Sequence, residues 1–263
     1  MIRKEIKTYL KGFIIWTLII TLLYLGVAIL YPHVITDDTM KSMDELMKVF
    51  SPEVLKAFNM DMASMSSYYG WFKTEGFTFL LMVIGIYASI LGSNILLVEE
   101  SEKTIEYLGT LPMKRSKIIT NKIIVSILFI LLMIFIISFT NYIALLSGGD
   151  FSHKEYLLLS ITPILIALPL YSINLFISTF MHKTKKTLGI SLGLVFIFYI
   201  INILSDISEK AKFLKYFTIY TLSDVRNVIA KLRINPMMVI ISIAITIIFI
   251  TGTYIRYNKK ELV

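Results

Sequence analysis

The feature that most constrains this chain is a set of six long apolar runs, each free of Asp, Glu, Lys, Arg and His. Uncharged apolar stretches of about 18 or more residues are typical of membrane-spanning helices. The chain is 56% hydrophobic, above the usual share for a soluble domain. We therefore predict an all-α integral membrane protein. Its six expected spans are residues 13–31, 77–98, 123–146, 157–180, 187–204 and 237–255.

The spans account for nearly half of the 263 residues and leave no room for a separate soluble catalytic domain. We expect one transmembrane domain covering residues 1–263. The first run is too long, and lacks a small-residue cleavage site, to be a removable signal peptide. Cysteine is absent, so neither a disulfide framework nor a thiolate metal site is expected.

The distribution of basic residues predicts the orientation. With both termini inside the cell, the short inner segments 1–12, 99–122, 181–186 and 256–263 carry 15 of the 26 Lys and Arg residues. The longer outer segments carry the other 11, six of them in 205–236. We expect a multi-pass protein of the cell membrane with cytoplasmic termini. The net charge of +8 is then explained by anionic headgroups, without a nucleic-acid partner.

The absence of charge in the six spans argues against a carrier driven by an ion gradient and against an ion channel with a charged filter. Carriers driven by ion gradients usually place ionisable groups at the membrane midplane, and many channels use charged filters. The sequence also lacks a His-Glu-x-x-His or Gly-x-Ser-x-Gly motif, and it has no Gly-x-x-x-x-Gly-Lys-Ser/Thr loop to hold a nucleotide phosphate. We therefore expect no catalysis, metal or cofactor in this chain itself.

The loops between the spans contain amphipathic stretches. Residues 1–12 alternate apolar and basic positions and predict an interfacial helix on the inner leaflet. Loop 32–76 predicts short helices, one from Met40 to Phe50 and another capped by Ser51. Loop 205–236 predicts two more, the second capped by Ser223. We expect both loops to form helical structure on the extracellular side.

Segment 99–122 is a charged island between the second and third spans. Ile105, Leu108 and Leu111 follow helical spacing, so a helix here has one apolar edge and an otherwise acidic surface. Pro112 ends that helix, and Ser116 is a suitable N-cap for the next. Such a segment can be a solvated loop on lipid headgroups, or a handle that a soluble protein binds.

The order of residues in this segment resembles the cytoplasmic coupling loop of type-2 ATP-binding-cassette exporter permeases. The family has an acidic pair, a Gly-Thr-Leu-Glu-like core, a Leu-Pro step and a basic residue after its second span. The chain differs at Lys103, where the family often has Gly, and at Ser116, which follows the basic residue. The resemblance implies ATPase-coupling roles for Glu99, Glu100, Glu102, Thr104, Glu106, Leu108, Leu111, Pro112 and Arg115.

This resemblance implies a second permease copy or a sister permease, and a separate cytoplasmic ATPase subunit that binds ATP and Mg. An uncharged pathway suits a hydrophobic or amphipathic cargo such as a peptide, an antimicrobial compound or a lipid. Weak candidates for its lining are Tyr87, Ser93, Asn94, Asn141 and Asn202. Gly189 and Gly193 are small residues four apart and predict close helix packing or a dimer seam. The alternatives are an ion-gradient-driven carrier and a non-transporting membrane immunity protein.

Overall fold

A computed structural model describes residues 2–51, 55, 66–104, 114–147, 151–207 and 209–260. Within these ranges all regular structure is helical, and six helices are long and apolar enough to cross a membrane. The predicted all-α membrane protein is therefore confirmed. The longer elements are α1 (Ile2–Val34), α6 (Phe77–Asn94), α9 (Arg115–Leu146), α10 (His153–Ser178), α11 (Thr184–Ile207) and α13 (Pro236–Asn258).

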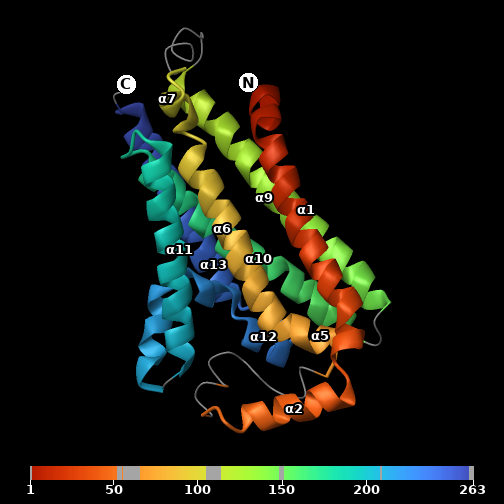
Figure 1. The fold of residues 1–263 in the computed structure, drawn as a ribbon. Coiled ribbons are helices and arrows are strands. Elements are labelled where there is room, and N and C mark those ends of the chain that lie inside the picture. Colours follow the sequence, from red (N-terminus) through yellow and green to blue (C-terminus); the bar gives the residue numbers. More distant parts are fainter. Residues whose placement is uncertain are drawn as a thin grey trace.

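Shorter helices connect the long ones. They are α2 (Asp37–Met47), α5 (Tyr68–Trp71), the π-helix η1 (Phe72–Gly76), α7 (Val98–Ser101), the 3₁₀ helices η2 (Glu209–Phe217) and η3 (Ile219–Ser223), and α12 (Val225–Lys231). Figure 1 shows that both termini and α7 lie at one end of the bundle, hereafter the terminal end. Helices α2, α5 and α12 lie at the opposite, distal end.

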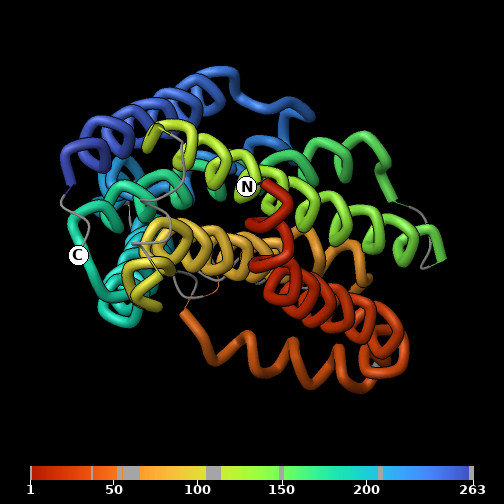
Figure 2. Tube along the Cα trace, turned by 90° about the horizontal axis from the view of Figure 1, so that it is seen from above, coloured from red at the N-terminus to blue at the C-terminus, as the bar shows by residue number. Residues whose placement is uncertain are grey.

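Helices α6 and α10 form the interior of the bundle. In the view of Figure 2, α6 has α1 on one side and α11 on the other, and α9 and α13 lie above it in the picture. Side chains from α6 and α10 are the most deeply buried of the six spans, and α10 also contacts α13, α9 and η3. The outward faces of α1, α9, α11 and α13 carry exposed Leu, Ile and Phe side chains, as expected for helices in contact with lipid.

Glycines on α6 allow this close packing. A Cβ atom on Gly92 would lie 2.5 Å from the backbone oxygen of Tyr171 on α10, and one on Gly85 would lie 2.8 Å from the Tyr220 hydroxyl. Gly189 and Gly193 are exposed, and no described atom of another helix lies within 4 Å of where their Cβ atoms would stand, so their predicted close packing is not seen within this chain. Their role in a seam between two copies stays a prediction.

Polar side chains also join the interior helices. Asn174 on α10 is fully buried, and its amide nitrogen donates to Ser89 Oγ on α6 at 2.9 Å and to the Leu170 oxygen at 2.8 Å. The helix continues through Pro163 and Pro169, so the prolines do not break it. In a medium without water, these hydrogen bonds satisfy groups that would otherwise be costly to bury.

Several expected boundaries differ from the structure. Residues 2–12 continue without interruption into the first span as α1, so they do not form a separate interfacial helix. The second span begins at Tyr68, because α5 and η1 run directly into α6. Helix α9 begins at Arg115, which places Ser116 inside its first turn and not at the predicted N-cap. In each case the helix extends past the edge of the apolar run, where residues outside the run still make contacts with neighbouring helices, such as Tyr68 with Asn141 and Arg115 with Lys260.

The distal connections are largely helical, as predicted. Helix α2 contains the methionines expected in the first loop and begins with a capping box formed by Thr36 and Thr39. The second predicted helix of that loop, at Ser51, lies outside the described residues. In loop 205–236, Ser223 does not cap α12; it ends η3, and its hydroxyl donates to the Tyr220 oxygen at 3.0 Å. The contact of Tyr220 with Gly85 shows that η3 reaches well inside the bundle.

Candidate functional site: a buried ion cluster at the terminal end

Charged side chains are buried together where segment 99–122 meets the bundle. Lys122, near the start of α9, is fully buried, and its ammonium lies 2.7 Å from Glu99 Oε1 and 3.1 Å from Glu5 Oε2. Glu99 belongs to α7 and Glu5 to the first turns of α1. One lysine therefore links α1, α7 and α9.

A second lysine makes the adjacent link. The ammonium of Lys260, which follows α13, lies 2.7 Å from Glu100 Oε1 and 3.0 Å from Glu100 Oε2, and it donates to the Met181 oxygen at 2.6 Å. His182 Nδ1 lies 3.0 Å from the same Glu100 carboxylate. We call Glu5, Glu99, Glu100, Lys122 and Lys260 the ion cluster.

Hydrogen bonds fasten both ends of the segment to the same region. Ser101 Oγ contacts Thr184 Oγ1 and accepts from the Thr184 backbone N–H at 3.1 Å, which joins α7 to the start of α11. On the other side, Arg115 Nη1 donates to the Lys260 backbone oxygen at 2.8 Å. The segment is therefore anchored to neighbouring helix ends through Ser101 on one side and Arg115 on the other.

The electrostatics explain why these groups lie together. A buried charge without a partner is strongly unfavourable, and each carboxylate of the ion cluster has a lysine within 3.1 Å. Burial lowers the pKa of Lys260 from its ordinary value, while its hydrogen bond to Glu100 acts in the opposite direction. Separating any member from its partner would leave a charge unpaired, so the connected helix ends are held as one unit.

The structure divides the predicted coupling residues into two groups. Glu99 and Glu100 are only 6% exposed, so the expectation that they lie on the surface of the segment is wrong. The expected continuous helix is also interrupted, because α7 ends at Ser101 and Lys103 has a φ of 56°. Glu102 and Thr104 are exposed beyond α7, and Arg115 is exposed at the start of α9. Glu106, Leu108, Leu111 and Pro112 lie outside the described residues.

Three members of the ion cluster were not singled out from the sequence. Lys122 and Lys260 lie at the ends of apolar runs, where a basic residue is an ordinary anchor at the membrane interface, and Glu5 lies in the short segment before the first run. Glu5 is the only acidic residue among residues 1–12, and Lys122 directly precedes the third run. Those two positions are the available signal, but two of the pairs join residues more than 100 positions apart, Glu5 with Lys122 and Glu100 with Lys260.

The candidate pathway residues do not form one lining. Tyr87 is buried against Trp16 of α1, and Ser93 donates to the Ile90 oxygen of its own helix. Asn141 accepts from the Tyr68 hydroxyl at 2.9 Å near the distal end. Asn94 is half-buried near the terminal end of α6, and its side-chain oxygen has no partner among the described residues.

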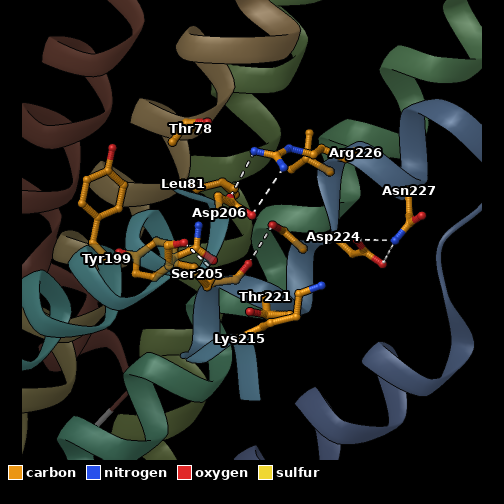
Figure 3. Close-up of a pocket in the computed structure, with 14 residues that line it drawn as sticks. Thr78, Leu81, Tyr199, Ser205, Asp206, Lys215, Thr221, Asp224, Arg226 and Asn227 are labelled. Carbon is orange, nitrogen blue, oxygen red and sulfur yellow. Dashed lines mark hydrogen bonds and ion pairs between the residues drawn. The ribbon is translucent and has the colours of Figure 1, made fainter. Parts of the chain in front are cut away.

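Asn202 lines a cavity near the distal end. This cavity has a volume of about 300 Å³ and lies between α6, α11 and the segment from η2 to α12. Figure 3 shows the Arg226 guanidinium next to the Asp206 carboxylate, and an ion pair of 3.2 Å joins them. The cavity is therefore at the distal side of the bundle, away from the ion cluster.

Comparison with known proteins identifies the family. A search of curated proteins and a search of solved structures found no significant match. The family model described as ABC-2 family transporter protein matches residues 1–262, nearly the whole chain. A match of that extent agrees with the six spans and with the loop resemblance noted in the sequence. The chain belongs to the ABC-2 family of membrane transporter proteins.

Proposed function

We propose that this chain is the membrane-spanning subunit of an ATP-driven exporter, and that a separate ATP-binding-cassette ATPase binds its terminal end. The family supports a transmembrane transporter subunit. The terminal end carries the segments richest in Lys and Arg, which favours its placement in the cytoplasm, where such an ATPase would lie. The ATPase would bind ATP and Mg, for which this sequence offers no phosphate-binding loop.

The ion cluster is the observation that carries this proposal. The exposed residues Glu102 and Thr104 follow directly after α7, whose two glutamates are tied to α1, α9 and the end of α13. A force applied to the exposed part of segment 99–122 therefore reaches several span ends at once. Rigid connection of this kind is what a partner needs to tilt helices and switch a pathway between two states.

We propose that the pathway forms between two permease subunits and that the cargo is a hydrophobic or amphipathic compound, such as an antimicrobial peptide. None of the predicted midmembrane runs carries a charge, and the outward faces of α1, α9, α11 and α13 are apolar. An uncharged route lowers the cost of moving apolar groups, while a charged ion would meet a large desolvation penalty there.

The test is co-purification of the chain with an ATP-binding-cassette ATPase from membranes, followed by measurement of ATP turnover. We expect association in the wild type, and loss of association when Glu102→Lys is combined with Glu106→Lys and Leu108→Asp. Lys41→Glu on α2 serves as the charge-reversal control at the distal end, and we expect it to keep association.

Transport by the purified chain alone under an ion gradient would contradict this function and favour a carrier. Protection against a toxin that persists after removal of every ATPase partner would instead favour an immunity protein. Reconstitution into proteoliposomes, with and without the ATPase and ATP, distinguishes these outcomes.

A further inference from the structure

The distal cavity combines an aromatic wall with a charged wall. Tyr199 and Tyr220 contact each other edge to face at a centroid distance of 5.6 Å, and Leu81 of α6 adds an apolar side chain. Another side of the cavity is formed by η2 and the N-cap of α12, which contribute Lys215 and Asp224. A volume of about 300 Å³ lies at the small end of the range for ligand sites.

Lys215 and Asp224 lack oppositely charged partners. Among the described residues, Lys215 has neither an ion pair nor a hydrogen bond, although it is half-buried. The Asp224 carboxylate is also half-buried and accepts only from the amide of Asn227, at 2.8 and 2.9 Å. No ion pair joins the two residues to each other. One positive and one negative group therefore line the same cavity, and neither forms an ion pair with a described residue, although Lys231 and Arg233 line a second cavity together with Asp224.

Two other charged residues of this cavity are paired with each other. Asp206 and Arg226, which also line the cavity, form an ion pair of 3.2 Å and neutralise each other. Among the described residues, the buried side-chain oxygens of Tyr220 and Thr221 have no hydrogen-bond partner, and the Tyr220 hydroxyl lies close to Gly85 of α6.

We propose that this cavity binds a zwitterionic group, with its oxyanion on Lys215 and its ammonium on Asp224. A ligand with a single charge would satisfy one of these residues and be repelled by the other, whereas a zwitterion satisfies both. The aromatic wall then contacts the carbon atoms between or beside the two charges. Two sources share this chemistry: a free amino acid or short peptide, and the phosphoethanolamine headgroup of a lipid.

Direct binding to the purified chain in detergent tests the proposal, because it requires neither ATPase nor transport. The probes are L-alanyl-L-alanine and glycerophosphoethanolamine, measured by isothermal titration calorimetry. N-acetylated L-alanyl-L-alanine, which lacks the ammonium, and its amide, which lacks the carboxylate, are the matched controls. We expect at least one zwitterion to bind, with each capped peptide bound about tenfold more weakly or worse.

Single substitutions locate the site. Lys215→Gln and Asp224→Asn are each expected to weaken binding about tenfold, since each removes one charge-assisted contact. Lys212→Gln, on the same helix η2 but outside the cavity lining, and Asp44→Asn on α2 should bind as the wild type does. The capped peptides test the same point on the wild-type chain if a variant fails to fold.

The pattern of binding decides between the sources. Binding of the dipeptide alone supports an amino acid or peptide ligand, and binding of glycerophosphoethanolamine alone supports a lipid headgroup. Absence of binding by both zwitterions overturns the proposal. Equal binding of capped and uncapped peptides, or unchanged binding by Lys215→Gln and Asp224→Asn, also overturns it. If the wild-type chain does not associate with an ATPase, the proposed function is contradicted, but the binding of a zwitterion to this cavity is not affected.

Discussion

Replacing Lys122 with methionine tests the ion cluster most severely. The lysine side chain is fully buried, and its ammonium pairs with Glu99 at 2.7 Å and Glu5 at 3.1 Å. Methionine fills a similar volume but leaves both carboxylates buried without a cation. Removing one partner of a buried ion pair typically costs about 3–5 kcal/mol. We expect Lys122→Met to lower the free energy of unfolding by about that amount.

Two milder substitutions give smaller expected losses of unfolding free energy, with which Lys122→Met is compared. Glu99→Gln keeps a hydrogen-bond acceptor and leaves Lys122 paired with Glu5, so we expect a loss of about 1–3 kcal/mol. Glu102→Gln changes an exposed carboxylate just beyond α7 and should stay within about 0.5 kcal/mol of the wild type. The predicted order of destabilisation is therefore Lys122→Met, then Glu99→Gln, then Glu102→Gln.

A combined variant separates lost pairing from lost packing. Adding Glu5→Gln and Glu99→Gln to Lys122→Met removes the unpaired charges, and neutral replacements of buried ion pairs are often well tolerated. We expect the triple variant to be more stable than Lys122→Met alone. The assay is reversible unfolding in mixed detergent micelles, followed by the fluorescence of Trp16 and Trp71. A Lys122→Met variant within about 1 kcal/mol of the wild type, or a triple variant less stable than the single one, would refute the reasoning.

The same unfolding assay checks two further predictions. Gly92→Ala should lower the free energy of unfolding by about 1–3 kcal/mol, because its Cβ would lie 2.5 Å from the Tyr171 oxygen. Gly189→Ala has open space around its Cβ and should be nearly neutral. Equal effects of the two substitutions would contradict the contact between α6 and α10. Asn141→Leu should cost about 1–3 kcal/mol, because it removes the acceptor of the Tyr68 hydroxyl, and Tyr68→Phe should recover part of this loss in the double variant. Additive losses in that double variant would show that the two side chains do not interact.

The sequence predicted the number and approximate place of the spans because hydropathy is a local property. Boundaries such as Tyr68 and Arg115 were missed because helices continue past the apolar run where side-chain contacts sustain them. The packing glycines were missed for another reason. Spacing drew attention to Gly189 and Gly193, while Gly85 and Gly92 pack because of which face of α6 meets α10, a fact of the tertiary structure.

For the charged residues too, the sequence showed where they lie along the chain but not which of them meet in the fold. The sequence drew attention to the acidic pair Glu99 and Glu100, yet Glu99 is buried against Lys122, at the other end of the same segment, and Glu100 against Lys260, which is 160 positions away. A single sequence cannot reveal that Lys260 lies against Glu100. It could also not reveal that Asn202 lines a cavity, since that cavity is closed by η2, η3 and α12.

The central claim, that an ATPase binds the terminal end from the cytoplasm, is tested most directly with single cysteines, because the natural chain contains none. Glu102→Cys lies in the exposed stretch after α7, and Val49→Cys lies just after α2, which is at the distal end. We predict that Glu102→Cys cross-links to the co-purifying ATPase and reacts with a membrane-impermeant maleimide only from the cytoplasmic side, and that Val49→Cys does neither. Labelling of Glu102→Cys only from outside the cell, or cross-linking of the ATPase to Val49→Cys instead, would contradict the account.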